Sequence, residues 1–234
     1  MRQPVQHIRS FVRREGRITD GQQQALEKYW WKYGVDFTGD RLDLDQVFHR
    51  SAPKVMDIGT GMGDTTVSLA KCNPENDYLA VEVHRPGVGS LLRQIVMNNL
   101  TNIRISNHDV VEILQQQIPE NSLDLVYIFF PDPWPKKRHH KRRLINDSFL
   151  QILKSRLKAN ARIFIATDWA DYAEHILDVF NQTQDYFNLA GHNQASPRPN
   201  WLPRTRFEQR GYNNNNKIWN FLFARGAGLV KTRP

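Results

Sequence analysis

The sequence predicts an α/β fold in which helices cover both faces of a mainly parallel sheet. From Lys54 onwards, short apolar runs of strand type alternate with segments whose apolar residues recur at helical spacing. The strand-type runs are almost continuously apolar, which is typical of strands buried on both faces. With 234 residues, the chain is long enough for one large domain of this class.

The alternation places five strands in this region, at residues 54–58, 77–83, 102–109, 123–130 and 161–168. Helical spacing predicts helices between them, at residues 65–72, 87–100, 144–157 and 172–180, with a short helix after Asp109. Residues 217–225 alternate between apolar and polar, and they follow the irregular segment 191–216 instead of a helix. They are consistent with an antiparallel strand added to the sheet.

The N-terminal part is expected to lie outside this pattern. Residues 1–18 are basic and predict a flexible arm, and residues 19–234 predict a single domain. Thr19 is placed to cap a helix over residues 21–33, with Gly34 near the end of that helix.

Three features favour a cytoplasmic location. The basic start is not followed by an apolar segment, so we expect no secretory signal. The longest clean apolar run, residues 125–130, is far too short for a membrane span. Cys72 is the only cysteine, so an internal disulfide is excluded and the chain suits a reducing compartment.

The positive charge of the chain is concentrated in three segments. Residues 1–17 hold five arginines and one glutamate, residues 136–143 hold six lysines and arginines, and residues 198–210 hold four arginines and one glutamate. The net charge of the whole chain is only +8, so the remainder is acidic. Basic patches on an otherwise acidic chain favour a nucleic-acid partner over evenly solvated surface.

A glycine-rich turn, DIGTGMGD, follows the first predicted strand, with glycines at 59, 61 and 63. Glycine permits the tight turn and lets a ligand approach the backbone. The spacing is G-x-G-x-G, and Asp64 stands where a dinucleotide-binding turn would need its third glycine. Asp57 at the start of the turn would repel phosphate but could bind an ammonium group. A purely structural turn is the alternative.

Acidic residues also end the second and third predicted strands. Glu82 lies 21 residues beyond Gly61, where a carboxylate can accept hydrogen bonds from both hydroxyls of a ribose. Asp109 could meet an adenine edge, although each of these acids could also be an ordinary helix N-cap. In an open α/β sheet, the carboxyl ends of the strands surround the ligand crevice.

The fourth predicted strand runs into FFPDPWPKKRHHKRR, residues 129–143, where Asp132 stands between two prolines. Pro131 and Pro133 restrict the backbone and thereby limit the entropy lost when the loop is ordered. Trp134 could stack on a base. A stiff structural loop with a buried tryptophan is the alternative.

The ordered set of Asp57, the glycines, Glu82 and Asp109 resembles the S-adenosylmethionine-dependent methyltransferases with a Rossmann-like sheet. That resemblance implies seven strands, one of them antiparallel and near the end of the chain. Pro-Asp-Pro-Trp is also similar in plan to the Asn/Asp-Pro-Pro-Tyr loops of enzymes that methylate amino groups.

Longer stretches resemble one family, the bacterial tRNA (guanine-N7-)-methyltransferases, from about residue 9 to 225. These stretches are RSFVRREGR at 9–17, EVHRPGVG at 82–89, FFPDPWPKKRHHKRR at 129–143, ATDW at 166–169 and TRFEQRG at 205–211. The resemblance implies an enzyme that transfers a methyl group from S-adenosylmethionine to N7 of guanine 46 in the tRNA variable loop.

The resemblance further implies roles for individual residues. The methyl donor would contact Asp57, Gly59, Gly61, Gly63, Glu82, Asp109 and Asp132, of which Asp132 is also the catalytic-loop acid. The substrate would contact Lys136, Asp168, Thr205, Arg206, Phe207 and Glu208. The RNA backbone would contact Arg138, His139, His140, Lys141, Arg142 and Arg143. Two positions depart from the family pattern: many relatives have glutamate where Asp57 stands, and Pro135 is an unusual third proline.

The chemistry of guanine N7 suggests what Asp132 does. N7 carries a lone pair in the base plane, so it attacks a sulfonium methyl group without prior deprotonation, and in-line positioning supplies most of the catalysis. The product base is cationic, and Asp132 or Asp168 could stabilise it or accept hydrogen bonds from guanine N1–H and N2–H₂. We therefore expect Asp132 to orient and stabilise and not to act as an obligate general base.

Three other functions are compatible with parts of the sequence. A nucleotide-dependent oxidoreductase uses a similar sheet, but the G-x-G-x-G spacing opposes it. A non-catalytic RNA-binding module is opposed by the intact acids, and a methyltransferase for an exocyclic amine is suggested by the Pro-Asp-Pro-Trp plan alone. His139 and His140 have no partner at metal-ligand spacing, so we expect no metal site, and nothing implies an obligate protein partner.

Overall fold

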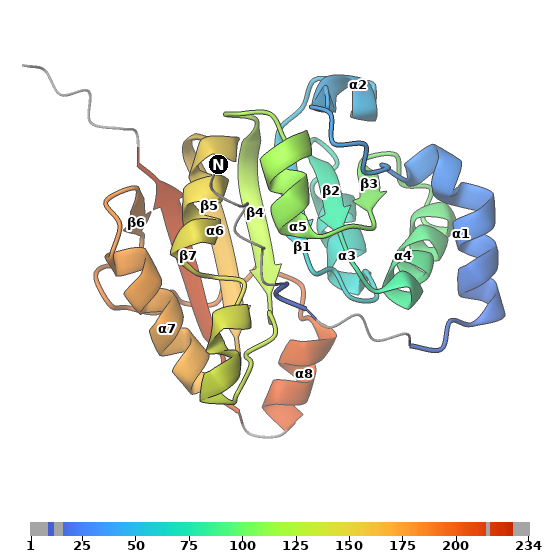
Figure 1. Ribbon diagram of the computed structural model, residues 1–234. Helices are drawn as coiled ribbons and strands as arrows, with labels where there is room; N and C mark the ends of the chain where they lie inside the picture. Colours follow the sequence, from blue (N-terminus) through green and yellow to red (C-terminus); the bar gives the residue numbers. More distant parts are fainter. Residues whose placement is uncertain (1–8, 12–15, 214–215, 227–234) are drawn as a thin grey trace, which may run out of the picture.

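One seven-stranded sheet organises the described part of the chain, which in this computed structural model comprises residues 9–11, 16–213 and 216–226 (Figure 1). The strand order is β3-β2-β1-β4-β5-β7-β6. In chain order the strands are β1 (Lys54–Ile58), β2 (Asp77–Val81), β3 (Ile103–Ser106), β4 (Leu123–Phe129), β5 (Leu157–Thr167), β6 (Tyr186–Asn188) and β7 (Trp219–Arg225).

Strand β7 is antiparallel to both of its neighbours, β5 and β6, whereas β1 to β5 are parallel to one another. The predicted mainly parallel sheet with one antiparallel strand near the end of the chain is therefore confirmed. Strand β6 lies at the edge and was not predicted from the residues, because three residues are too few to show a period. Strand β5 starts at Leu157, inside the segment that the sequence predicts as a helix.

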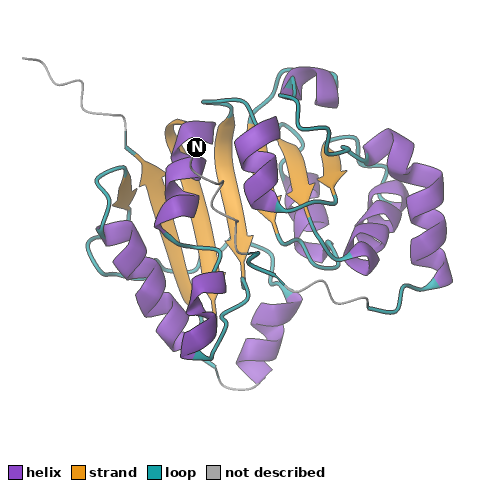
Figure 2. Cartoon of the chain, viewed as in Figure 1, coloured by secondary structure: helices purple, strands orange, loops and turns teal. Residues whose placement is uncertain are grey.

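Helices lie on both faces of the sheet, as predicted (Figures 1 and 2). The helices are α1 (Asp20–Tyr33), α2 (Leu44–Phe48), α3 (Asp64–Cys72), α4 (Arg85–Met97), α5 (Val110–Glu112), α6 (Asp147–Arg156), α7 (Ala170–Asn181) and α8 (Arg206–Asn213), with a π-helix η1 (Ile113–Gln117) and a 3-10 helix η2 (Lys137–Arg142). Helix α8 falls within the segment predicted to be irregular, so that prediction was wrong. None of the described helices is long and apolar enough to cross a membrane.

Two hydrophobic clusters hold the helices against the sheet. Alternate residues of β4 point to opposite faces, so Val126 and Ile128 lie in one cluster and Tyr127 lies in the other. The first cluster includes buried residues of α5, α6 and α7, and the second includes buried residues of α1, α3 and α4. Both faces are therefore apolar, which explains why the strands show almost continuous apolar runs.

Helix α1 begins with the predicted cap at Thr19. The Thr19 hydroxyl accepts a hydrogen bond from the backbone N–H of Gln22, and the Gln22 side chain accepts one from the backbone N–H of Thr19 at 2.9 Å, which makes a capping box. After Gly34 the chain runs alongside β3, where Val35 N–H donates to the Ile105 carbonyl at 2.7 Å. The predicted arm, residues 1–18, lies largely outside the described residues.

Helices α1 and α4 pack closely at Gly89 but leave more room at Gly21. A Cβ on Gly89 of α4 would lie 2.6 Å from the Gln22 carbonyl oxygen, whereas the atoms nearest to a Cβ on Gly21 of α1 belong to the flexible Arg93 side chain, at 3.4 Å and beyond. We expect Gly89→Ala to lower the free energy of unfolding by about 1–3 kcal/mol, because the clash outweighs the gain in helix propensity.

The matched variant Gly21→Ala should leave stability unchanged or raise it by up to about 1 kcal/mol, because alanine favours the helix at a position that has room for its methyl group. Urea unfolding of both variants measures the difference. Equal effects of the two substitutions would contradict the close approach of α1 to α4.

Candidate functional site

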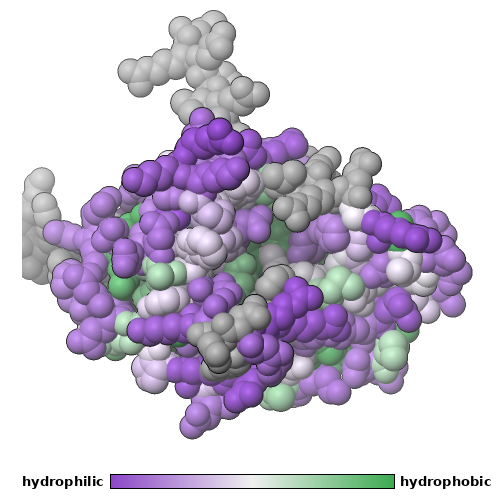
Figure 3. All heavy atoms as spheres, turned by 90° about the horizontal axis from the view of Figure 1, so that it is seen from below, coloured by the Kyte–Doolittle hydropathy of each residue, from purple (hydrophilic) through white to green (hydrophobic). Residues whose placement is uncertain are grey.

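The carboxyl ends of β1, β2 and β4 open onto a cleft of about 710 Å³. Figure 3 shows this end of the molecule, where the surface is hollowed and apolar side chains are visible inside. The cleft is lined on one side by the glycine turn and Glu82, and on the other by the loop from Phe130 to Lys136. A smaller pocket of about 70 Å³ adjoins the same turn. The predicted crevice is therefore present at the predicted edge of the sheet.

The three glycines of the turn have different roles. All three have positive φ, at 76° for Gly59, 57° for Gly61 and 90° for Gly63. A Cβ on Gly59 or Gly61 would meet no described atom within 4 Å, and both residues line the cleft, so their backbone is open to a ligand. A Cβ on Gly63 would lie 2.7 Å from Leu91 Cδ1, so Gly63 serves the packing of α3 against α4. Gly63, which is predicted to contact the donor, lines neither of these two pockets.

Glu82 fixes the shape of this turn. One carboxylate oxygen accepts a hydrogen bond from Gly61 N–H at 2.7 Å, and the other accepts one from His84 N–H at 2.8 Å. Burial raises the pKa of Glu82, and these backbone hydrogen bonds oppose that rise. Each carboxylate oxygen keeps a second lone pair, so Glu82 can hold the turn and still accept a hydrogen bond from a ligand in the cleft.

Asp57 lies beneath the turn and borders the smaller pocket. Its carboxylate is buried and accepts a hydrogen bond from the Thr66 hydroxyl at 2.6 Å. Burial, and to a smaller extent the nearby charge of Glu82, raises the pKa of Asp57 to about 7. The carboxyl group can therefore gain or lose a proton near neutral pH.

Asp109 caps α5 in the structure, because its Oδ1 accepts a hydrogen bond from Val111 N–H at 2.9 Å. The N-cap alternative that the sequence left open is thus the contact observed. Asp109 is buried, and its neighbour Val110 lines the cleft. The cap brings the start of α5 to the cleft wall.

The proline-bounded loop forms the opposite wall of the cleft. Asp132 is exposed there, and both Phe130 and Trp134 have positive φ, at 51° and 48°. Positive φ is uncommon for residues with bulky side chains, so the surrounding structure must hold the loop in this shape. The loop therefore presents the carboxylate of Asp132 to the cleft.

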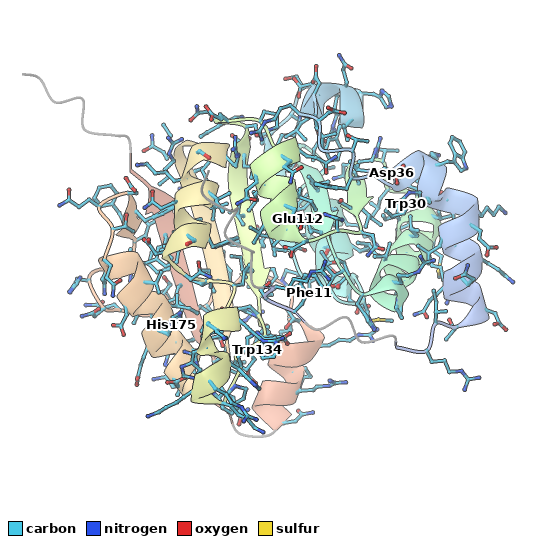
Figure 4. The ribbon with its side chains drawn as sticks, viewed as in Figure 1. Phe11, Trp30, Asp36, Glu112, Trp134 and His175 are labelled. Atoms are coloured by element: carbon cyan, nitrogen blue, oxygen red, sulfur yellow. The ribbon has the colours of Figure 1, made fainter. Side chains whose placement is uncertain are left out.

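Trp134 is half-buried and contacts the N-terminal segment. Its indole N–H donates to the Ser10 carbonyl at 3.0 Å, and its ring lies perpendicular to that of His139, with the ring centres 5.8 Å apart. Phe11, from the same segment as Ser10, also lines the cleft (Figure 4). Ser10 and Phe11, which belong to the family-like stretch at residues 9–17, thus lie at the site. The sequence did not predict this contact.

The TRFEQRG stretch forms the start of α8. The Thr205 hydroxyl accepts a hydrogen bond from Glu208 N–H at 2.9 Å, and the Glu208 carboxylate accepts one from Thr205 N–H at 3.3 Å, which makes a second capping box. Glu208 also pairs with Arg198. Thr205 and Glu208 are therefore buried in helix-capping contacts. This cap could have been predicted from the sequence, because T-x-x-E is the pattern of a capping box.

The other predicted substrate residues come from three different segments. Arg206 makes two contacts with the Asp64 carboxylate, at 2.7 and 3.1 Å, which join α8 to the start of α3. Asp168 is half-buried at the end of β5, 3.4 Å from the Asn216 amide nitrogen. Lys136 is exposed and lines the cleft, and the side chain of Phe207 lies outside what the structure describes.

The basic run does not lie wholly on the surface. Lys136, Lys137, Arg138 and Lys141 are exposed, whereas His139, His140 and Arg142 are half-buried. Arg143 is only 2% exposed, and it donates a hydrogen bond to the Pro133 carbonyl and pairs with Asp171. Its guanidinium is directed into the protein, which opposes the prediction that Arg143 contacts the RNA backbone. Among the described residues there is no cluster that could hold a metal ion.

The strand order, the single antiparallel strand and the ligand cleft at the carboxyl ends define a Rossmann-like methyltransferase fold. Solved structures share this fold at low sequence identity. The 16S rRNA methyltransferase KamB has a TM-score of 0.56 at 11% identity, over 80% of this chain and 95% of that chain. An rRNA methylase from Streptococcus thermophilus has a TM-score of 0.50 at 12% identity, over 75% of this chain and 87% of that chain.

Comparison of sequences identifies the family. A family model described as "Putative methyltransferase" matches residues 51–221. The tRNA (guanine-N(7)-)-methyltransferase of Nitrosospira multiformis is 50% identical over 226 residues, which cover 96% of this chain and 97% of that protein. The enzyme of the same name from Escherichia coli K12 is 47% identical over 222 residues, which cover 95% and 93% of the two chains. The chain belongs to the bacterial tRNA (guanine-N7-)-methyltransferase family, which removes the oxidoreductase and non-catalytic alternatives.

The raised pKa of Asp57 predicts how stability depends on pH. The folded carboxyl keeps its proton up to about pH 7, whereas the unfolded one loses it near its ordinary pKa of 3.8, so folding binds a proton between these values. The contribution of this group to stability is present below pH 3.8 and is lost as pH rises towards 7, by about 1.4 kcal/mol per pH unit at most.

The variant Asp57→Asn removes this titration but keeps an oxygen that can accept the hydrogen bond from Thr66. Relative to the wild type, it should therefore gain stability as pH rises from 4 to 7. Urea unfolding of both proteins at several pH values checks this. A stability difference that does not change with pH would show that Asp57 is ionised in the folded protein throughout this range.

Proposed function

We propose that this protein transfers the methyl group of S-adenosylmethionine to N7 of guanine 46 in the tRNA variable loop. Membership of the tRNA (guanine-N7-)-methyltransferase family supports the reaction class and the substrate. The observation that carries the proposal is the shape of the cleft, in which the glycine turn with Glu82 faces the loop that bears Asp132. A donor on one wall would thereby meet a base on the other. We place the reaction in the cytoplasm and invoke no obligate protein partner.

The donor would bind along the glycine turn. The second lone pairs of the Glu82 carboxylate would accept hydrogen bonds from the ribose hydroxyls, and the open backbone at Gly59 and Gly61 would let the ligand approach closely. The start of α5, at Asp109 and Val110, would lie beside the adenine. Asp57 borders the smaller pocket and would face the ammonium group of the methionine moiety.

The reaction itself would need little proton transfer. The N7 lone pair forms a bond to the methyl carbon, the carbon–sulfur bond breaks, and its electron pair stays on sulfur as a neutral thioether. Positive charge then appears on the guanine. Asp132 is exposed on the cleft wall and would stabilise this charge, because a fixed carboxylate requires no reorganisation as the charge develops.

The exposed part of the basic run would hold the RNA backbone. Lys136, Lys137, Arg138 and Lys141 are exposed beside the cleft, and Arg206 is exposed at the start of α8. Cations that neutralise phosphates release counterions, so affinity for tRNA should fall as salt rises.

Unmodified tRNA and isotopically labelled donor, followed by mass spectrometry of the nucleosides, test the activity directly. We expect label in 7-methylguanosine in wild-type tRNA and its loss in a tRNA in which guanine 46 is replaced by adenine. Label in 7-methylguanosine at another position of the tRNA would contradict the assignment to guanine 46 but not the reaction. Label on an exocyclic amine would support the alternative suggested by the loop.

Two substitutions at Asp132 separate stabilisation of charge from base catalysis. Removal of the carboxylate in Asp132→Ala and of its charge in Asp132→Asn should each lower the single-turnover rate of methyl transfer by about 10²–10³-fold, as loss of an electrostatic stabiliser does. Asp132→Asn should retain more activity, because its amide oxygen can still accept a hydrogen bond from guanine. A solvent deuterium isotope effect on the wild-type rate that is absent from Asp132→Asn would instead indicate proton transfer to Asp132 and hence a general base.

A further inference from the structure

Arg143 ends the basic run but lies inside the protein. It is 2% exposed, whereas three members of the run between Lys137 and Lys141 are exposed. A buried guanidinium is costly unless hydrogen bonds and an opposite charge compensate it. The contacts of Arg143 therefore indicate why a cation is held there.

The guanidinium of Arg143 joins three parts of the molecule. Its Nε donates to the Pro133 carbonyl at 3.0 Å, and its Nη2 lies 3.1 Å from His140 Nε2 in the 3-10 helix η2. The same Nη2 pairs with the Asp171 carboxylate at the start of α7, and the guanidinium lies 4.9 Å from the centre of the Tyr172 ring. One side chain thus connects the loop that bears Asp132 to a helix packed on the sheet.

The Pro133 carbonyl is a critical anchor because of the composition of the loop. Pro131, Pro133 and Pro135 have no backbone N–H, so the loop has few donors with which to fix itself. The carbonyl of Pro133 belongs to the residue that follows Asp132. A hydrogen bond to this carbonyl from a rigid, buried guanidinium therefore restrains the backbone next to the catalytic-loop acid.

Asp132 also interacts electrostatically with the same cluster. Tyr172 is fully buried, and its hydroxyl accepts a hydrogen bond from Ile145 N–H at 3.3 Å. Burial, and to a smaller extent the negative charge of Asp132, raises the pKa of Tyr172. The Asp132 charge is therefore close enough to affect the residue on which Arg143 is stacked.

We propose that Arg143 is a positioning residue for methyl transfer: it holds the Pro133 carbonyl, and through it the carboxylate of Asp132, against α7. The proposal rests on the function proposed above. It assigns the basic run two tasks, because the exposed cations bind RNA whereas Arg143 orients the acid. Asp171 is the partner that keeps the guanidinium in place.

The variant Arg143→Lys retains the positive charge but loses the planar fork that reaches both Pro133 and Asp171. We expect its single-turnover rate of methyl transfer to fall at least tenfold, with KM for tRNA changed less than threefold. The salt dependence of tRNA binding should equal that of the wild type, because a buried cation releases no counterion.

Lys141→Ala is the matched control, since Lys141 is an exposed cation of the same 3-10 helix. It should raise KM for tRNA and reduce the slope of log affinity against log salt by roughly 0.7–0.9, as expected for one lost phosphate contact. A reduced slope in Arg143→Lys as well would overturn the proposal, because it would show that Arg143 contacts RNA.

Asp171→Asn provides a second route, because the Asp171 side chain is 58% exposed and the substitution should not prevent folding. It should lower the single-turnover rate about three- to tenfold, whereas Glu174→Gln, which removes an exposed carboxylate from the same helix, should leave the rate unchanged. If Arg143→Lys does not fold, this pair decides the question.

Each single-turnover rate is divided by the fraction of protein that is folded, which the amplitude of thermal unfolding gives. Wild-type rates in Arg143→Lys and Asp171→Asn would show that Arg143 only stabilises the fold, and the proposal would then be wrong while the methyltransferase function stood. Absence of methyl transfer by the wild-type protein would contradict the proposed function instead, so the two failures are distinguishable.

Discussion

The site depends on a geometric constraint, which is that β1, β2 and β4 are parallel and in register at their carboxyl ends. Ile58 of β1 pairs with Val81 of β2 on one side and with Ile128 of β4 on the other. Each strand therefore ends at the same edge, and the residues that follow are brought together: the glycine turn, Glu82 and the proline-bounded loop. Side chains that are far apart in sequence become the two walls of one cleft because the backbone hydrogen bonds of the sheet fix their starting points.

Hydrogen bonds to backbone groups then convert this proximity into a defined shape. Glu82 holds Gly61 and the start of α4, and Asp109 holds the start of α5, so two of the acids set the shape of the cleft wall. Across the cleft, the proline-rich loop has few backbone donors, and the Arg143 side chain supplies one to the Pro133 carbonyl. Both walls therefore rely on buried charged groups whose cost is offset by such bonds.

The start of α8 forms a further part of the site. Arg206 at the start of α8 pairs with Asp64 at the start of α3, so the segment proposed to contact tRNA is attached to the helix that follows the glycine turn. This pair is partly exposed and contributes little to stability. Its effect is geometric, because it holds α8 beside the smaller pocket, where Asp57 and Thr205 also lie.

The sequence by itself determined the class of the fold, the order along the chain of every strand except β6, and the acids at the carboxyl ends of β1, β2 and β4. These properties follow from local patterns, namely continuous apolar runs, glycine spacing and prolines, which the rest of the protein does not override. Only the tertiary structure decided which side chains in a pattern are used. Gly63 packs on Leu91, and Arg143 is buried although Lys141, two residues before it, is exposed. The physical reason is that the burial of a charge depends on partners distant in sequence, as Asp171 is from Arg143, and a run of like residues does not specify which member meets that partner.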